Sequence, residues 1–523
     1  MIIHLCLRRL ILHRRIHANN KKYTEMKYLL ICFFSATVAG AAAQPGGNMQ
    51  HNKNTLLNQS FWQTKPDVEA VKAEITKGND PAEQNAMAMD PVVTAINAGA
   101  PDESIIYLLE QKGNNVDKLT HDSRTYIFWA ALKGNVAVMQ YLIKKGAKVN
   151  IEDSHGMSPF NFAASAGQQN TKVYDLLLQN GQNVKTDLTE DGANALLLGV
   201  ANDTDFKLTT YFQSKGLSIK SKDANGNTAF DYAARAGNIG IMKILLEKGV
   251  GYTDNAMLMA AQGGRRGGNS LEVFQYLESV GIKATVISRN RENVLHAIVR
   301  RPGSTAIIQY FLSKGVNINQ ADNKGNTVFM NASAYNQDTG TIALLLPLVK
   351  DINQKNNAGA GALALAVRNN IAGVAGYLIN HGADAQAADA KGNTLVSYLF
   401  EGYNPRQAKD FESKLNLLKA KGFSITTNPA DGNTLYHLAV SKNDLNLLKA
   451  ASTYGADINA KNQEGLTALH KAAMMAKDDS IIKYLLSAGA QKDIKTSFNE
   501  TAYDLASENE ALSKSSKSID FLK

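Results

Sequence analysis

DGNTLYHLAVSKNDLNLLKAASTYGADINAKN (residues 431–462) is followed directly by QEGLTALHKAAMMAKDDSIIKYLLSAGAQKD (463–493), and the second line repeats the first. Gly432 and Gly465, which open the two copies, are separated by 33 residues. Each copy runs from Gly-x-Thr through an apolar segment with small residues, a polar turn and a second apolar segment to Gly-Ala. This order predicts a pair of helices per copy, with a hairpin between successive copies.

The residue types at the ends of these segments explain the helices. Thr434 and Thr467 stand just before an apolar run, where a side-chain oxygen can accept from a free N–H of the first helical turn. Gly489 provides the left-handed residue that ends the second helix. The local sequence therefore sets both the start and the stop of the predicted helices.

The second helix of each copy has an apolar stripe that one copy cannot bury. The pairs Ile481/Ile482 and Leu485/Leu486 are four residues apart and so lie on one helix face. Another unit must cover that face. The pattern predicts a stack of units that share one continuous core.

Residues 465–473 (GLTALHKAA) and 455–459 (GADIN) resemble the ankyrin repeat, a family with a period near 33 residues and a T-P-L-H-x-A core. The segments 156–164 (GMSPFNFAA) and 226–234 (GNTAFDYAA) repeat the pattern, and Pro159 occupies the first helical position. The resemblance implies an all-α solenoid of helix-turn-helix units joined by β-hairpin loops. Its partners would then bind the concave face formed by hairpin tips and first-helix ends.

The register of the repeat extends along most of the chain. Weak copies cover residues 55–78 and 86–113, and with them the array has about fourteen units. The opening residue of each later unit occupies an equivalent place: Ser123, Gly156, Gly192, Gly226, Thr253, Arg291, Gly325, Gly359, Gly392, Gly432, Gly465 and Asn499. We expect a leader over 1–43, a linker over 44–54, the array over 55–498 and a C-terminal capping repeat over 499–523.

The leader ends in a pattern typical of a secretory signal peptide. Residues 26–43 have the basic Lys27 directly after Met26, continue through a short apolar stretch and end in Ala41-Ala42-Ala43. The Arg-rich residues 1–25 would make an unusually long n-region, so we expect translation to begin at Met26. A transit peptide is the alternative. We therefore expect a bacterial protein that is exported to the periplasm, the cell surface or the medium.

Most of the excess positive charge lies in the leader. The formal net charge is +9, but residues 1–43 carry seven Lys and Arg against one acid, which leaves 49 basic and 46 acidic residues in the remainder. Both cysteines, Cys6 and Cys32, also lie in the leader. A nearly neutral array argues against a nucleic-acid partner and against general binding of polyanions.

Two insertions interrupt the register, and both are expected between the helices of a unit. The first contains 263–270 (GGRRGGNS), which lacks the lysine of a phosphate-binding loop because Asn269 stands in its place. The second is 401–411. The repeat between the opening residues Gly226 and Thr253 is shorter than the others, which predicts a shortened hairpin.

We find no paired acid and base, nucleophile or cofactor loop, so the sequence predicts no catalytic residue and no cofactor.

The histidines are interpreted as structural. His296, His437 and His470 occupy the fourth position of the T-x-L-H motif, where the resemblance implies hydrogen bonds within the turn. His121 and His155 lie in successive hairpins, but two imidazoles without a third ligand make a poor metal site. No metal site is predicted.

The candidate partner-binding residues follow the small pair at the end of a first helix or lie in the adjoining insertion. They are Lys133, Arg235, Arg265, Arg266, Arg300, Arg301, Tyr335, Arg368 and Asn369. Arginine pairs with carboxylates bidentately, so the cluster favours an acidic protein or peptide. The alternative, that these residues are solvated surface charges, stays open.

The function that these patterns favour is a non-enzymatic scaffold for protein–protein interaction. A secreted effector that engages host proteins is one alternative. An enzyme with a site in residues 263–270 or 401–411 is another, and a panel of hydrolase and transferase substrates would reveal it. The mature chain is expected to have no transmembrane segment.

Overall fold

The computed structural model describes residues 53–264, 267–423, 432–476, 478–514 and 519–523. It divides into two compact units, Met1–Lys283 and Ala284–Lys523. In these described ranges the chain forms helices and isolated β-bridges and no strand. The predicted leader and Arg265 and Arg266 lie outside the described residues.

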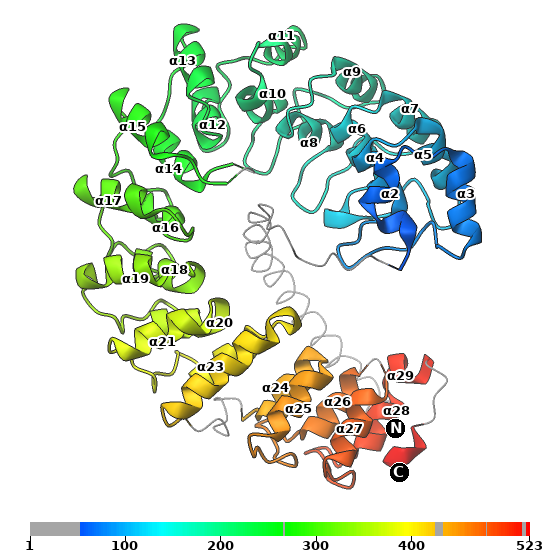
Figure 1. The fold of residues 1–523 in the computed structure, drawn as a ribbon, viewed down its shortest axis with the longest axis vertical. Helices are drawn as coiled ribbons and strands as arrows, with labels where there is room; N and C mark the ends of the chain where they lie inside the picture. Colours follow the sequence, from blue (N-terminus) through cyan, green and yellow to red (C-terminus); the bar gives the residue numbers. More distant parts are fainter. Residues whose placement is uncertain (1–52, 265–266, 424–431, 477, 515–518) are drawn as a thin grey trace, which may run out of the picture. The chain divides into compact units, whose positions relative to one another are not determined.

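Within the described residues of the first unit, the helices follow one another in pairs, seven in number. Figure 1 shows their order. Their bounds are α2 (Gln59–Gln63) and α3 (Val68–Thr76), α4 (Pro91–Ala98) and α5 (Asp102–Leu109), α6 (Tyr126–Lys133) and α7 (Val136–Lys144), α8 (Pro159–Ser165) and α9 (Thr171–Gln179), α10 (Ala195–Gly199) and α11 (Lys207–Ser214), α12 (Ala229–Arg235) and α13 (Ile239–Glu247), α14 (Asn255–Gln262) and α15 (Leu271–Ser279).

The part of the second unit that the structure describes contains seven further pairs. Their bounds are α16 (Leu295–Ile298) and α17 (Thr305–Ser313), α18 (Val328–Tyr335) and α19 (Thr339–Leu345), α20 (Ala362–Asn369) and α21 (Ala372–Asn380), α22 (Leu395–Glu401) and α23 (Ala408–Ala420), α24 (Leu435–Lys442) and α25 (Leu445–Ser452), α26 (Ala468–Met475) and α27 (Ser480–Ser487), α28 (Ala502–Ser507) and α29 (Glu510–Lys514). Short 3₁₀ turns cover Thr55–Leu57, His121–Ser123, Val200–Asn202, Leu346–Leu348, Pro405–Gln407 and Asp520–Leu522.

Residues predicted from the sequence to start or end a helix lie at the ends of the observed helices. The Oγ1 atom of Thr467 accepts from the backbone N–H of His470 at the start of α26, and Pro159 is the first residue of α8. Gly489 has a φ of +102° just after α27. The prediction of helix pairs, about fourteen in number, is therefore confirmed.

The helices stack in two rows within each unit. In the second unit, α20 contacts the first helices α18 and α22, and α21 contacts the second helices α19 and α23. In the first unit, the Phe160 ring of α8 lies 5.0 Å from the Tyr174 ring of α9, which lies 5.0 Å from the Phe212 ring of α11. Because all three rings are buried, neighbouring pairs share one core, as the apolar stripe predicts.

The connecting hairpins also join neighbouring repeats through the backbone. The Ala390 N–H donates to the Ala358 carbonyl at 3.1 Å, and Asn357 donates to Lys324 in the same way at 3.0 Å. Lys355 and Gly361 form an isolated β-bridge inside one hairpin. These bonds satisfy backbone groups that a long connection would otherwise leave exposed.

The first insertion lies between the helices of a pair, as predicted, whereas the second lies only partly between them, because its last residues belong to α23. Residues 263–270 connect α14 to α15, and α23 with its preceding turn takes up most of 401–411. The first insertion therefore follows a helix, unlike a phosphate-binding loop. Among the described residues, none of the helices combines the length and the hydropathy that a membrane span requires.

Candidate partner-binding surface

Arg235, Arg300 and Arg368 occupy the same place in three alternate repeats. Each follows the opening residue of its repeat by nine positions, and they are 65 and 68 residues apart, close to two repeat periods. Arg235 is the last residue of α12, Arg300 lies just beyond α16, and Arg368 is in the last turn of α20. In this stretch, the first helix of every other repeat therefore ends at an arginine.

Each of the three arginines reaches forward to the next repeat. Arg235 Nε donates to the Gly263 carbonyl at 3.3 Å, within the first unit. In the second unit, the Arg300 guanidinium carbon lies 4.1 Å from the centre of the Tyr335 ring, and that of Arg368 lies 5.5 Å from the Tyr398 ring. A contact with an aromatic face orients the planar guanidinium.

Two buried asparagines hold the helix ends that carry these residues. Asn336 Nδ2 donates to the carbonyls of Val299 and Arg301, at 2.8 and 3.1 Å. Asn370 Nδ2 donates to the carbonyls of Ser333 and Asn336, at 2.9 and 2.7 Å. Carbonyls at the end of a helix have no partner within the helix, so these amides satisfy them. The positions of Arg300 and Tyr335 are therefore fixed from the neighbouring repeat.

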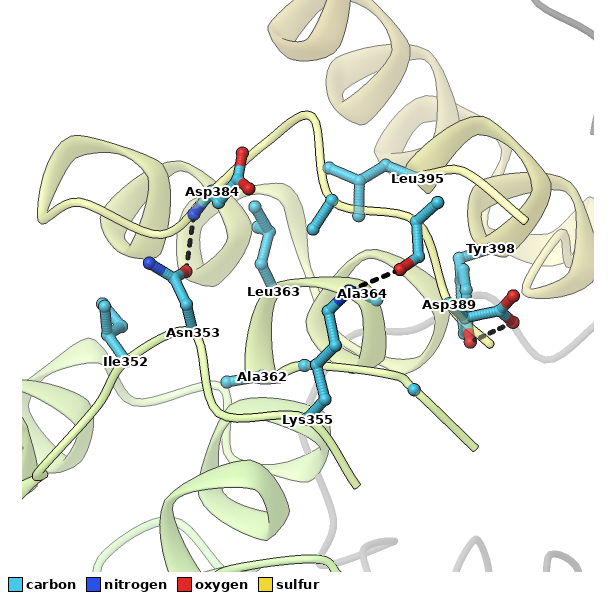
Figure 2. Close-up of a pocket in the computed structure, with 14 residues that line it drawn as sticks. Ile352, Asn353, Lys355, Ala362, Leu363, Ala364, Asp384, Asp389, Leu395 and Tyr398 are labelled. Carbon is cyan, nitrogen blue, oxygen red and sulfur yellow. Dashed lines mark hydrogen bonds between the residues drawn. The ribbon is translucent and has the colours of Figure 1, made fainter. Parts of the chain in front are cut away.

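Tyr398 is fixed by a contact that the sequence reading missed. Its hydroxyl donates to Asp389 Oδ2 at 2.9 Å, as Figure 2 shows. Tyr232 donates to Asp223 in the same way at 3.0 Å, so an Asp nine residues before the Tyr was the available signal. Burial, and then the hydrogen bond to Asp389, raises the pKa of Tyr398. The neutral phenol thus remains a donor under the Arg368 side chain.

The cavity beside Asp389 is too small for an organic ligand. It lies between the hairpin and helix of successive repeats, where Lys355 Nζ donates to the Ala388 carbonyl and Asn353 Oδ1 accepts from the Asp384 N–H (Figure 2). Its volume is about 20 Å³. Since that is about the space of one water molecule, the cavity is a packing feature of the repeats.

The remaining predicted residues differ in their accessibility. Lys133 is exposed at the end of α6, in the first unit. Arg301 is half-buried, and burial followed by the like charge of Arg300 lowers its pKa. Asn369 is less accessible than predicted, because its Nδ2 atom is enclosed without a hydrogen-bond partner and its Oδ1 accepts from Arg368 Nε at 3.3 Å. Asn369 therefore supports Arg368.

The motif histidines have the structural role that the resemblance implies. His470 Nδ1 accepts from the Thr467 N–H at 3.0 Å, and His470 Nε2 lies 2.8 Å from the Ile494 carbonyl. Because Nδ1 accepts, the neutral ring carries its proton on Nε2 and donates it to that carbonyl. His437 makes the equivalent bonds to Thr434 and Leu466. The imidazole thus links one hairpin to the next, which sequence reading did not foresee.

His121 and His155 do approach each other through a shared acid. Their Nε2 atoms lie 3.4 and 3.3 Å from Asp122 Oδ2, and Arg124 Nη1 lies 3.0 Å from the same oxygen. Next to Asp122, the Arg124 guanidinium supplies the positive charge that a bound metal ion would otherwise supply. Within the described ranges no group of three or more His, Cys, Asp or Glu could hold a metal ion.

The repeat geometry agrees with a comparison of the sequence with known families. The sequence model described as "Ankyrin repeats (3 copies)" matches residues 63–153, 92–187, 160–256, 295–389, 385–496 and 435–514, which together cover well over half of the chain. The chain belongs to the ankyrin-repeat family. In this family one helix pair with its hairpin turn forms the recurring unit.

Several known proteins contain segments similar to this ankyrin-repeat chain. One is the ankyrin repeat and KH domain-containing protein mask-1 of Caenorhabditis elegans, 23% identical over 81% of this chain and 16% of that protein. The human transient receptor potential cation channel subfamily A member 1 is 23% identical over 82% of this chain and 36% of its own length. Phosphocholine transferase AnkX of Legionella pneumophila is 23% identical over 49% of this chain and 22% of that protein. The chain thus covers well under half of each of these relatives.

Proposed function

We propose that this ankyrin-repeat chain is a non-enzymatic scaffold that binds an acidic protein or peptide through the ends of its first helices. The observation that carries the proposal is the placement of Arg235, Arg300 and Arg368 at one repeat position, each oriented by the following repeat. A solenoid offers an extended surface made of many small contacts. The family alone supports a protein partner, and the arginines support an acidic one.

The chemistry of arginine explains why these positions suit recognition. A guanidinium presents several N–H groups in a flat fork that matches a carboxylate, and it is less strongly hydrated than an ammonium. Outside residues 1–43 the basic and acidic residues nearly balance. Arginines at equivalent repeat positions on a nearly neutral protein therefore select a partner with a matching acidic patch better than they attract polyanions in general.

Affinity capture from the native producer tests this function. The chain from Gln44 onward, immobilised, is expected to retain a protein that elutes at raised salt, because exposed charge pairs are screened. The partner should show an acidic surface or segment. Capture that is independent of salt, or loss of capture only when the second helices are changed, would contradict the proposed binding surface.

The chain is further proposed to be exported, as a periplasmic, surface-bound or secreted binder. The basic start, apolar stretch and Ala41-Ala42-Ala43 of residues 26–43 support this location. N-terminal sequencing of the native protein should find a start near Gln44. A protein that retains Met1 would contradict export by this signal, and fractionation would separate a periplasmic binder from a secreted effector.

A further inference from the structure

The lysines of the first unit are concentrated on the second helices α7, α9 and α11. These helices, each taken with the turn that follows it, are residues 136–150, 171–186 and 207–220, and they contain eight Lys, one acid and no Arg. The equivalent stretches of the other second helices in this unit contain six Lys and ten acids. Those stretches are residues 68–82, 102–117, 239–253 and 271–285. The near balance of charge outside the leader therefore conceals a local basic surface.

Contacts between neighbouring repeats join the three turns. Asn150 Nδ2, in the turn after α7, donates to the Gly181 carbonyl after α9 at 3.0 Å. A Cβ on Gly216, after α11, would lie 2.9 Å from Cε of Lys185, which follows α9. The three helices also follow one another along the second-helix row (Figure 1). The turns therefore form one continuous edge of the first unit.

Five exposed lysines lie on this edge, and together we call them the lysine edge: Lys144, Lys145, Lys148, Lys185 and Lys220. The Lys145 ammonium lies 5.3 Å from the centre of the Tyr141 ring. Among the described residues, the other four ammonium groups make no ion pair and no hydrogen bond. The one acid of the three stretches, Asp175, is already paired with Lys215 at 2.7 Å. The lysine edge therefore has no acidic partner within the described part of the chain.

Folding does not explain such a concentration of like charges, because they repel one another in the compact state. A binding partner of opposite charge explains it. Lysine contacts a phosphate as a point charge on a long flexible stem, whereas arginine suits ligands that are held in one orientation. A fluid layer of lipid headgroups offers many phosphates and no fixed orientation. We propose that the lysine edge of the first unit docks on an anionic lipid surface.

A nucleic acid fits the same edge less well. Binding of a single strand combines basic residues with aromatic faces on which the bases stack. The Tyr141 ring lies beside Lys145, and the Tyr211 ring centre lies 4.9 Å from Lys215 Nζ. Both hydroxyls donate to carboxylates of the preceding repeat, at 3.1 and 2.8 Å. The two rings are thus engaged within the protein, and lipid headgroups require no such stacking.

Vesicle flotation tests the lipid assignment. The chain from Gln44 onward, which contains every described residue and lacks the basic leader, should float with vesicles that mix phosphatidylcholine and phosphatidylglycerol. Raised salt should release it, because exposed charges are screened. It should not float with vesicles of phosphatidylcholine alone. Equal binding to both kinds of vesicle, or no binding to the anionic ones, would overturn the proposal.

Paired substitutions show whether the lysine edge carries the binding. Each lysine near an anionic surface contributes about fivefold, so Lys144→Gln/Lys185→Gln should weaken vesicle binding about thirtyfold. The control, Lys243→Gln/Lys283→Gln, removes two exposed lysines of the same unit, from α13 and from the turn after α15, and should bind within about threefold of the native chain. Thermal unfolding checks that both variants are folded. Equal weakening in the two variants would contradict the assignment of the surface.

A labelled single-stranded DNA oligomer provides the test of the other class of partner. If the oligomer binds with the same dependence on the lysine edge and the anionic vesicles do not bind, the edge is a nucleic-acid surface and the proposal is wrong. The lysine edge belongs to the second helices, so the proposal does not depend on the scaffold function of the first-helix ends. Vesicle binding without capture of a protein partner would contradict the scaffold function alone.

Discussion

Single side chains link neighbouring repeats as much as they cap their own helices. His470 accepts from Thr467 in its own repeat and donates to Ile494 in the next, and buried Asn336 closes the end of the preceding first helix. A buried polar group that loses its partner costs more than an exposed one. A single repeat cannot bury its own core, so neighbouring repeats pack through a largely apolar interface. The buried hydrogen bonds add specificity to that interface.

Replacing His470 with Gln tests this role through the pH dependence of stability. Burial lowers the pKa of His470 below its ordinary value of 6.5, so the folded chain binds the proton less readily than the unfolded chain. As the pH falls below about 6.5, the unfolded state is protonated first and the free energy of unfolding decreases. His470→Gln should lower that free energy by about 1–3 kcal/mol at pH 7.5, and should lose less than the native chain on going to pH 5.

Urea unfolding at the two pH values gives both quantities. His381→Gln is the control. The His381 side chain is exposed, and its described hydrogen bond is with the carbonyl of Tyr377 in the preceding helix turn. This variant should keep the native pH dependence. If His470→Gln and the native chain lose stability in parallel as the pH falls, His470 does not contribute in this way.

At the scale of the elements, stacking of the hairpins sets which glycines tolerate a side chain. Gly359 and Gly226 hold the same hairpin position with φ of +80° and +84°. A Cβ on Gly359 would lie 2.2 Å from the Ala390 backbone N, whereas a Cβ on Gly226 would meet nothing within 4 Å. The next hairpin therefore does not pack against Gly226. This agrees with the shortened hairpin that the small separation between Gly226 and Thr253 predicts.

This difference gives a matched pair of substitutions. Gly226→Ala should cost about 1 kcal/mol, from the left-handed backbone alone. Gly359→Ala adds a clash with the next hairpin and should cost about 2–4 kcal/mol, a value typical of strain at a special backbone position. Thermal unfolding compares the two variants directly. Equal losses would show that the hairpins do not pack against each other as described.

Helix ends and repeat boundaries were predictable because they depend on local chemistry. Thr467 and Pro159 act within one turn of the chain, and the 33-residue period marks each copy. Contacts between repeats were harder to predict, since they depend on how one copy is rotated onto the next. The sequence did not reveal that Arg300 stacks on Tyr335, or that Asn369 is enclosed beside Arg368.

At the scale of the whole molecule, each unit combines an apolar core shared by its repeats with a polar surface of variable residues. The first helices are buried along most of their length and expose mainly their ends, whereas the second helices bury one face. The fold leaves the specificity to side chains such as the arginines. A charge change on the first-helix ends should therefore alter binding without altering folding, while the same change on the second-helix row should alter neither.

The affinity of the captured partner for two double variants tests this claim most directly. Arg300→Glu/Arg301→Glu reverses two charges at a first-helix end, and Lys314→Glu/Lys419→Glu reverses two exposed charges at the second helices of the same unit. We predict that the first variant binds the partner at least about tenfold more weakly at low salt, while the second binds within about twofold of the native chain. Equal binding by both variants would contradict the account.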